Sequence, residues 1–374
     1  MFSLRGSFIR IIGNKKVKSE LKKEEVKRIL VPNGRIGDMV CETPFLKALH
    51  KEFPKAEIDV YLDDVVAPLF KNCSYVNVIL NKNKYKIIKK VKILKMLNLL
   101  YEAWTRRKKY DLYFIFTNEM RALSVLSLKI LSPKYVISVY RREKFGIKKD
   151  ELTIYDRYIK KAQSSHMRDI YLSGIEAITD EIIKDRKYEI CLGNLENKYN
   201  NYFDKNKVNI IFNYLGGNFK KNLSYLELKE SCSKLLEIKE NIVVHIMTLP
   251  NKYEELLKQI ESWNEKRIMI CPETKDILDA AALIKYSDIL ASVDTGVVHA
   301  ASAFNIPVIS IFPNNENSIK YFSPMSDLSY IIKCEDKHYI KNFDKNLMCE
   351  NIKDILKQKE KNLYEKHNWN IKKL

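Results

Sequence analysis

The sequence predicts an α/β protein built from two doubly wound parallel sheets. The chain has 374 residues, which is more than one hydrophobic core usually serves and suits two domains of about 150 residues each. Short apolar runs alternate with stretches of helical period, a pattern typical of parallel sheets covered by helices on both faces. The pattern pauses at polar residues 193–207 and then restarts, so we expect two such units facing a central cleft.

The first unit is expected to span residues 28–192, with helices at 39–53 and 119–131 between its strands. The apolar runs that predict strands are 28–32, 58–62, 76–80, 111–116 and 135–139.

The second unit is expected to span residues 208–335, and 193–207 is the predicted linker. Its strands are predicted at 208–212, 242–247, 267–271, 289–293 and 308–312. Its helices are predicted near 225–238, 252–263, 277–286 and 295–304. Residues 336–374 are weakly patterned and predict a helical tail, with the helix around 351–365.

The chain is strongly basic, with 66 Lys and Arg against 47 Asp and Glu and a formal net charge of +19. Such an excess attracts nucleic acid, anionic lipid or phosphorylated glycolipid. A compositional preference for Lys, Asn and Ile is the alternative explanation. The 1–27 segment is a basic amphipathic leader that suits contact with an anionic membrane surface, unless it is only a frayed end.

Residues 81–109 hold eleven Lys and Arg and one Glu, with apolar side chains at helical spacing. We interpret them as a helix packed on the sheet, whose basic face is solvated or contacts an anionic surface. A nucleic-acid-binding protein would interleave its aromatic and basic residues on one exposed face. Here the aromatic residues occupy apolar helical positions, so we expect no nucleic-acid partner.

The cysteines and the absent motifs exclude several kinds of chemistry. Seven scattered cysteines without a CxxC pair do not form a zinc cluster or disulfide framework, and they favour a cytoplasmic protein. No apolar run reaches the roughly 18 residues that a membrane span needs. HExxH, EF-hand and G-x-S-x-G patterns are also missing, so we expect neither a metal site nor a covalent mechanism.

A glycine turn follows the first predicted strand and leads into a helix. Gly34 and Gly37 let the backbone approach a ligand, and Asp38 falls in the first helical turn. A carboxylate there stays ionised and can serve as a general base, although such residues often only stabilise the helix. The turn lacks the GxGxxG pattern of a dinucleotide site.

Two further turns could bind an anion. Asp294, Thr295 and Gly296 follow a strand and open a helix whose free N–H groups would point at the ligand, with His299 one turn later. Asp294 as an ordinary N-cap and His299 as a core histidine are the structural alternatives. The loop at 213–221 contains Gly217, which gives a flexible backbone, and ends with Lys220 and Lys221, which supply positive charge for a diphosphate. The structural alternative is an ordinary solvated loop.

These pieces together resemble glycosyltransferase family 9, the ADP-heptose:lipopolysaccharide heptosyltransferases, over roughly residues 28–325. The similar segments are 28–38, Glu42-Thr43-Pro44 to Leu49, Phe53-Pro54, Tyr110-Asp111-Leu112 leading to Arg121, 166–172, and 280–312 with Asp294-Thr295-Gly296, His299 and Pro307-Val308.

The resemblance implies a GT-B fold of two Rossmann-like domains, with the acceptor bound by the first domain and the nucleotide sugar by the second. It implies inverting transfer without a metal or other cofactor, with ADP-heptose as the donor. By position, Asp38 is the general base, while Gly34, Gly37 and Arg121 lie on the acceptor side. The implied donor-binding residues are Gly217, Lys220, Lys221, Thr248, Asp294, Thr295, Gly296 and His299.

The chain departs from the family pattern around the substrates, at residues 212–214, 222–224, Ile115 and 247–251. The expected activity is heptosyl transfer onto lipopolysaccharide core or a related glycan, at the inner face of the plasma membrane. The acceptor would be an anionic glycolipid or oligosaccharide. A transferase or epimerase with another nucleotide-sugar specificity is the alternative.

Overall fold

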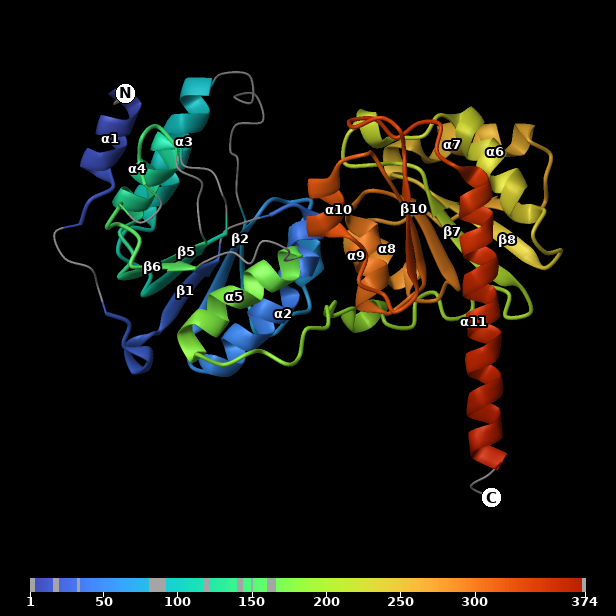
Figure 1. Ribbon diagram of the computed structural model, residues 1–374, viewed down its shortest axis with the longest axis horizontal. Helices are drawn as coiled ribbons and strands as arrows, with labels where there is room; N and C mark the ends of the chain where they lie inside the picture. Colours follow the sequence, from blue (N-terminus) through green and yellow to red (C-terminus); the bar gives the residue numbers. More distant parts are fainter. Residues whose placement is uncertain are drawn as a thin grey trace. The chain divides into compact units, whose positions relative to one another are not determined.

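The computed structural model describes residues 4–15, 20–31, 34–80, 92–116, 121–139, 144–148, 151–159 and 166–371 (Figure 1). The chain divides into two compact units. The first comprises Met1–Arg35 and Cys41–Lys187, and the second comprises Ile36–Val40 and Tyr188–Leu374. The first turn of one helix, α2 (Ile36–Glu52), therefore belongs to the second unit, although the rest of that helix belongs to the first.

The first unit contains a six-stranded parallel sheet in the order β3-β2-β1-β4-β5-β6. Its strands are β1 (Arg28–Val31), β2 (Glu57–Leu62), β3 (Asn77–Leu80), β4 (Leu112–Ile115), β5 (Tyr135–Val139) and β6 (Arg157–Ile159). The central strand β1 is buried along most of its length because helices cover both faces of the sheet.

Helices α1 (Leu4–Ile12), α3 (Lys92–Thr105) and α4 (Ala122–Leu131) lie on one face of this sheet, and α2 and α5 (Met167–Thr179) lie on the other (Figure 1). On the α2 side, Phe45 packs edge-on against Phe114 of β4. On the α4 side, fully buried Ile9 of α1 shares a core cluster with Val125. Part of the basic leader is thus packed into the first unit.

The second unit repeats the same sheet topology in the order β12-β11-β10-β7-β8-β9, and all its pairs are parallel. Numbered within each unit, both sheets read 3-2-1-4-5-6, the doubly wound order that binds nucleotides where the strand order reverses. Its strands are β7 (Val208–Asn213), β8 (Ile242–Met247), β9 (Ile268–Ile270), β10 (Ile289–Val293), β11 (Val308–Phe312) and β12 (Ser329–Lys333). The two sheets confirm the predicted α/β fold class.

The second unit closes with a long helix that belongs to its core. Met348, Ile352 and Ile355 of α11 are fully buried in the same cluster as the strands. The other helices are α6 (Tyr225–Leu236), α7 (Tyr253–Ser262), α8 (Ile277–Ile284), α9 (Gly296–Ala303) and α10 (Glu316–Phe322), and α11 is Lys345–Ile371. Short 3-10 turns occur at Lys23–Glu25, Ala67–Phe70, Gly193–Leu195, Phe219–Lys221 and Pro250–Lys252.

The segment expected as a linker is fastened to α8. The Lys198 ammonium lies 2.6 Å from the Asp279 carboxylate, and the Tyr199 hydroxyl donates to the same carboxylate at 3.0 Å. Because Tyr199 and Phe203 are also buried, this segment packs as part of the second unit. No helix in the described part of the chain is both long and apolar enough to cross a bilayer.

Candidate functional site

The motifs singled out in the sequence lie at the carboxyl ends of strands where each strand order reverses. The 34–38 turn follows β1, at the junction of β1 and β4. In the second unit, the 213–221 loop follows β7 and the 294–299 turn follows β10, and β7 and β10 are neighbours. This crevice is where open α/β sheets bind ligands, so the topology places both second-unit motifs at one candidate site.

The ends of β7 and β10 are joined by a buried hydrogen-bond relay. The Asn213 side-chain amide donates to the Ser292 hydroxyl at 3.0 Å and to the Leu215 carbonyl at 3.0 Å. The Ser292 hydroxyl in turn donates to the Val293 carbonyl at 2.8 Å. Because Asn213 and Ser292 are both buried, these bonds satisfy groups that would otherwise be costly and fix where each loop leaves the sheet.

An ion pair connects the two loops. The Lys221 ammonium contacts the Asp294 carboxylate, which also accepts a hydrogen bond from the Ser318 hydroxyl at 3.1 Å. Asp294 is only 9% exposed, so its charge needs these partners. Gly216, in the loop that leads to Lys221, must be a glycine, because a Cβ at this position would overlap the Cβ of Lys221. The lysine is therefore held beside the start of α9.

Helix α9 presents its N-terminus at the same place. Its N-cap is Thr295, which has extended backbone and whose side chain caps no N–H group. The Val298 N–H already donates to the Thr295 carbonyl at 3.2 Å, so Gly296 and Val297 supply the N–H groups that this turn presents to an anion, and the helix dipole adds positive potential there. With the Lys221 ammonium alongside, the arrangement can bind a phosphate or diphosphate.

The first turn of α2 packs directly against α9 within the second unit. A Cβ on Gly37 would lie 2.9 Å from Cδ2 of His299, and a Cβ on Gly296 would lie 2.6 Å from Cγ2 of Ile36. Each glycine is therefore needed for this close approach. His299 is buried with its ring near Tyr188 at 6.2 Å and Phe322 at 6.1 Å, so it supports this contact from the inside.

Asp38 follows directly in this turn. It is the acidic residue in the first turn of α2 and is half-buried, next in the chain to the glycine that touches His299. A carboxylate at this position is stabilised in its ionised form by the dipole of its own helix. The structure thus brings the Asp38 segment and the α9 turn together in one unit. Gly34, at the start of the same turn, belongs to the first unit.

The remaining sequence candidates are placed differently. Lys220 extends over the Tyr339 ring, with its ammonium 5.1 Å from the ring centroid, instead of joining Asp294. Gly217 is exposed, and nothing lies within 4 Å of where its Cβ would be. Thr248 lies at the end of β8, where its hydroxyl is 3.3 Å from the Tyr214 hydroxyl. Arg121 is exposed beside α4 in the first unit.

Two polar partners received no role in the sequence interpretation, although Ser292 stands at the start of the motif that leads to His299. Ser318 reaches Asp294 from α10, and Ser292 lies inside an apolar strand. Ser292 lies two residues before Asp294 on the strand that leads into the motif, whereas Ser318 lies within α10, where no local pattern marks it. Within the described residues, no group of three or more His, Cys, Asp and Glu side chains is arranged to hold a metal ion.

The family model for glycosyltransferase family 9 (heptosyltransferase) matches residues 106–352, which is about two thirds of the chain. The chain belongs to glycosyltransferase family 9. It is therefore a glycosyltransferase, and the predicted family membership is confirmed. The match spans the β7 and β10 loops with Lys221 and Asp294.

Solved structures of the family share the fold of this glycosyltransferase. The Escherichia coli ADP-heptose LPS heptosyltransferase II aligns with a TM-score of 0.63 at 14% identity, over 89% of this chain and 99% of that one. A family 9 glycosyltransferase from Veillonella parvula gives a TM-score of 0.64 at 16% identity, covering 89% and 97%. The E. coli heptosyltransferase WaaC with ADP gives 0.64 at 13% identity, covering 88% and 99%. The expected GT-B fold is confirmed.

A curated relative is similar over a shorter stretch. A Haemophilus influenzae protein, provisionally named a glycosyltransferase, is 29% identical over 119 residues. The aligned part spans 31% of this chain and 32% of that relative.

Proposed function

We propose that this family 9 glycosyltransferase transfers a heptose from ADP-heptose to lipopolysaccharide core or a related anionic surface glycan. In this proposal the reaction inverts the anomeric centre and uses no metal or other cofactor. The second unit binds the donor, and the first unit binds an acceptor carried by a glycolipid at the cytoplasmic membrane face. The solved relatives named for ADP-heptose and ADP support the choice of donor.

The observation that carries the proposal is the Lys221–Asp294 pair beside the uncapped start of α9. A nucleoside diphosphate leaves with negative charge on its terminal phosphate, and this charge grows in the transition state. Lys221 and the backbone N–H groups of Gly296 and its neighbours are fixed donors where that charge develops. Asp294 and Ser318 hold the lysine in place before the donor arrives.

In the proposed reaction the acceptor hydroxyl oxygen attacks the anomeric carbon of the donor sugar. The bond from that carbon to the diphosphate oxygen breaks, and the nucleoside diphosphate departs. Asp38 accepts the hydroxyl proton as general base. The Gly37 and Gly296 contact supports this role, because it holds the start of α2 against the helix that binds the diphosphate.

Nucleotide-dependent melting tests the donor site. A ligand that binds only the folded state raises the melting temperature, so we expect ADP to stabilise the protein more than GDP or UDP. The variant Lys221→Ala should lose most of this stabilisation, with ADP affinity lowered about tenfold or more. Lys229→Ala, an exposed lysine of α6, is the matched control and should respond to ADP as the wild type does.

Two outcomes would contradict the proposal. If ADP raised the melting temperature of Lys221→Ala as much as that of the control, the diphosphate would not bind at this site. A larger response to UDP or GDP would keep the site but assign another nucleotide sugar. Because Lys221→Ala leaves Asp294 without its cation, the double variant Lys221→Ala/Asp294→Asn separates loss of binding from loss of folding.

A further inference from the structure

The excess of positive charge lies entirely in the first unit. That unit contains 40 Lys and Arg and 21 Asp and Glu, a net of +19, whereas the second unit contains 26 of each. A compositional preference for lysine acts on the whole chain and would charge both units alike. The charge excess is therefore a property of the first unit and not of the overall composition, and it favours attraction to an anionic partner.

Helix α1 exposes an apolar stripe on the side away from the core. Leu4, Phe8 and Ile11 are spaced by four and three residues, so they share one helical face. Leu4 is 92% exposed and Ile11 is 75% exposed, whereas Ile9 on the opposite side is fully buried. Because Ile9 is buried against α4, the exposed residues Leu4, Phe8 and Ile11 face the solvent.

Helix α3 repeats this arrangement. Leu97, Tyr101 and Trp104 have the same spacing and are all exposed, with Trp104 at 62%. Ala103 is buried in a cluster with Leu131 of α4, so the helix is anchored by its other side. Figure 1 shows α1 and α3 packed in one layer with α4, and both helices contact α4. The two stripes therefore belong to the same face of the sheet.

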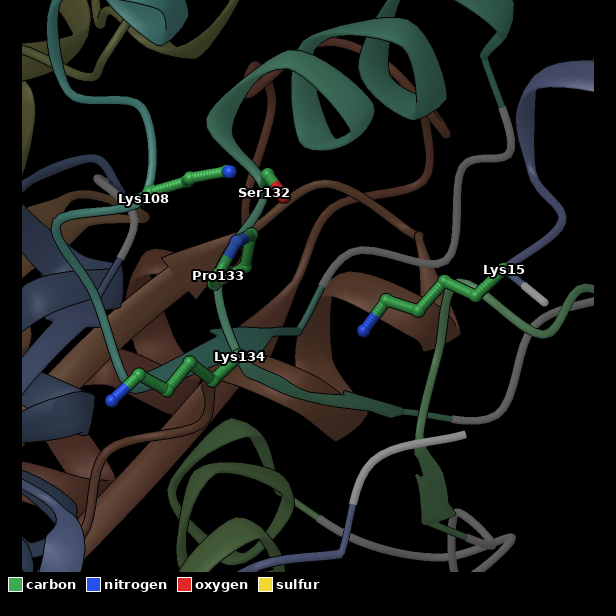
Figure 2. Close-up of a pocket in the computed structure, with 5 residues that line it drawn as sticks. All are labelled: Lys15, Lys108, Ser132, Pro133 and Lys134. Carbon is green, nitrogen blue, oxygen red and sulfur yellow. The ribbon is translucent and has the colours of Figure 1, made fainter. Parts of the chain in front are cut away.

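A basic pocket lies at the ends of these helices. It is open to solvent, has a volume of about 320 Å³ and is lined by Lys15, Lys108, Ser132, Pro133 and Lys134 (Figure 2). Lys15 comes four residues after Ile11, and Lys108 comes four residues after Trp104. Each stripe therefore leads toward the pocket along the chain.

Carboxylates orient two of the pocket lysines. The Lys15 ammonium lies 2.9 Å from Asp156, and the Lys134 ammonium lies 2.7 Å from Asp111. Among the described residues, Lys108 takes part in no such ion pair, and Figure 2 shows its amino group directed toward Ser132. The pocket thus contains one lysine without a carboxylate partner in the described part of the chain, Lys108, and two lysines oriented by carboxylates, an arrangement that suits contact with phosphate groups.

We propose that the two stripes and the pocket lysines form a single docking surface for an anionic lipid bilayer. This lipid-docking surface consists of Leu4, Phe8, Ile11, Leu97, Tyr101 and Trp104, with Lys15, Lys108 and Lys134. The apolar side chains enter the interface between headgroups and acyl chains, and the lysines meet lipid phosphates. The inference rests on the proposed function, in which the acceptor is a membrane glycolipid.

A bilayer fits this surface better than a nucleic acid does. Lipid offers both a layer of phosphates and an apolar layer beneath it, and the surface presents charge and aliphatic side chains together. Nucleic acid supplies phosphates and bases for stacking, but no apolar layer to receive Leu4 or Ile11. The net charge of +19 on this unit strengthens attraction to an anionic leaflet.

Vesicle co-sedimentation of the full chain tests the proposal. Vesicles of phosphatidylcholine and phosphatidylglycerol in equal parts should bind the protein at least about tenfold more tightly than phosphatidylcholine alone. The variant Leu97→Ser/Tyr101→Ser/Trp104→Ser should weaken binding to the mixed vesicles about tenfold or more. The matched control Leu226→Ser/Met269→Ser/Leu347→Ser changes three exposed apolar residues of the second unit and should bind as the wild type does.

The readouts separate this inference from the proposed function. Unchanged vesicle binding in the α3 variant, or equal loss in the control, would overturn the docking surface. So would a finding by sedimentation velocity that the α3 substitutions only dissociate a dimer. ADP-induced stabilisation is measured on the same proteins and should persist in both variants. Its absence from the wild type would count against the donor site, whatever the vesicles show.

Discussion

The two units of this glycosyltransferase have the same sheet topology but differ in net charge. Each carries six parallel strands in the doubly wound order. The first has a net charge of +19 and apolar stripes on two outer helices, whereas the second has no net charge. Topology depends on the buried apolar runs that both units share, so the exposed surface and the strand-end loops were free to diverge.

We relate this difference in charge to the different roles proposed for the two units. In our account, the neutral unit builds a small anion site from fixed donors, while the basic unit spreads its charge over a surface. A compact site gains from buried, oriented partners, as in the Lys221–Asp294 pair. A surface that meets lipid gains from exposed side chains and many cations.

The largest expected effect is on turnover. Asp38→Asn keeps the size of the side chain but removes the proposed base, so kcat should fall about a thousandfold. The ADP-induced rise in melting temperature should remain, because the diphosphate donors are unchanged. Glycosyl transfer assays and thermal melts check both parts. Near-normal turnover would show that another group takes the proton.

Acid should destabilise the protein through the second unit. His245 is buried, with Nε2 3.2 Å from the Asn209 side-chain oxygen, and burial lowers its pKa from 6.5 to about 4. The unfolded chain therefore binds a proton that the folded chain does not between these values. The free energy of unfolding should fall by about 3 kcal/mol from this group as pH drops from about 6.5 to 4.

The matching variant isolates this contribution. His245→Gln cannot titrate in this range, so its stability should depend less steeply on pH than that of the wild type. Denaturant unfolding at several pH values measures the difference. Parallel curves for the two proteins would show that His245 does not titrate as its burial implies.

Two adjacent glycines give a smaller, paired effect. Gly216→Ala places a Cβ against Lys221, including 2.9 Å from its carbonyl oxygen, and should cost about 1–3 kcal/mol while weakening ADP binding. Gly217→Ala meets open space and should change stability by less than about 0.5 kcal/mol. Denaturant unfolding of both variants checks the contrast. Equal costs would mean that the loop does not position Lys221 as described.

Much of the fold was predictable because most of its strands are continuous apolar runs, and the central strands of both sheets are buried. Ten strands were predicted from apolar runs, and the structure confirms all ten with small changes at their ends. The two missed strands, β6 and β12, are edge strands of their sheets. They are only partly buried, as in the sequence Arg157-Tyr158-Ile159, and an edge strand needs no continuous apolar run.

The C-terminal region shows what the sequence pattern hid. Residues 336–374 looked like a weakly patterned tail, yet Ile340, Phe343 and Met348 are buried in the core of the second unit. Ile340 and Phe343 lie in irregular turns before α11 and Met348 lies in its first turn, so no single period reveals all three. The loops of the candidate site were predictable from glycine turns at the ends of apolar strands. The hydrogen bonds of Asn213 with Ser292 and of Ser318 with Asp294 were not, because they depend on which strands are neighbours in the sheet.

Hydrogen exchange of the full chain with ADP, and separately with anionic vesicles, tests the division between the units most directly. Our account predicts that ADP slows exchange in the second-unit loops 214–222 and 294–299, while vesicles slow it in α1 and in 97–108 of the first unit. The two protected regions should not overlap. If ADP instead protected α1 and α3, or vesicles protected the 294–299 turn, the assignment of donor binding and lipid contact to separate units would be contradicted.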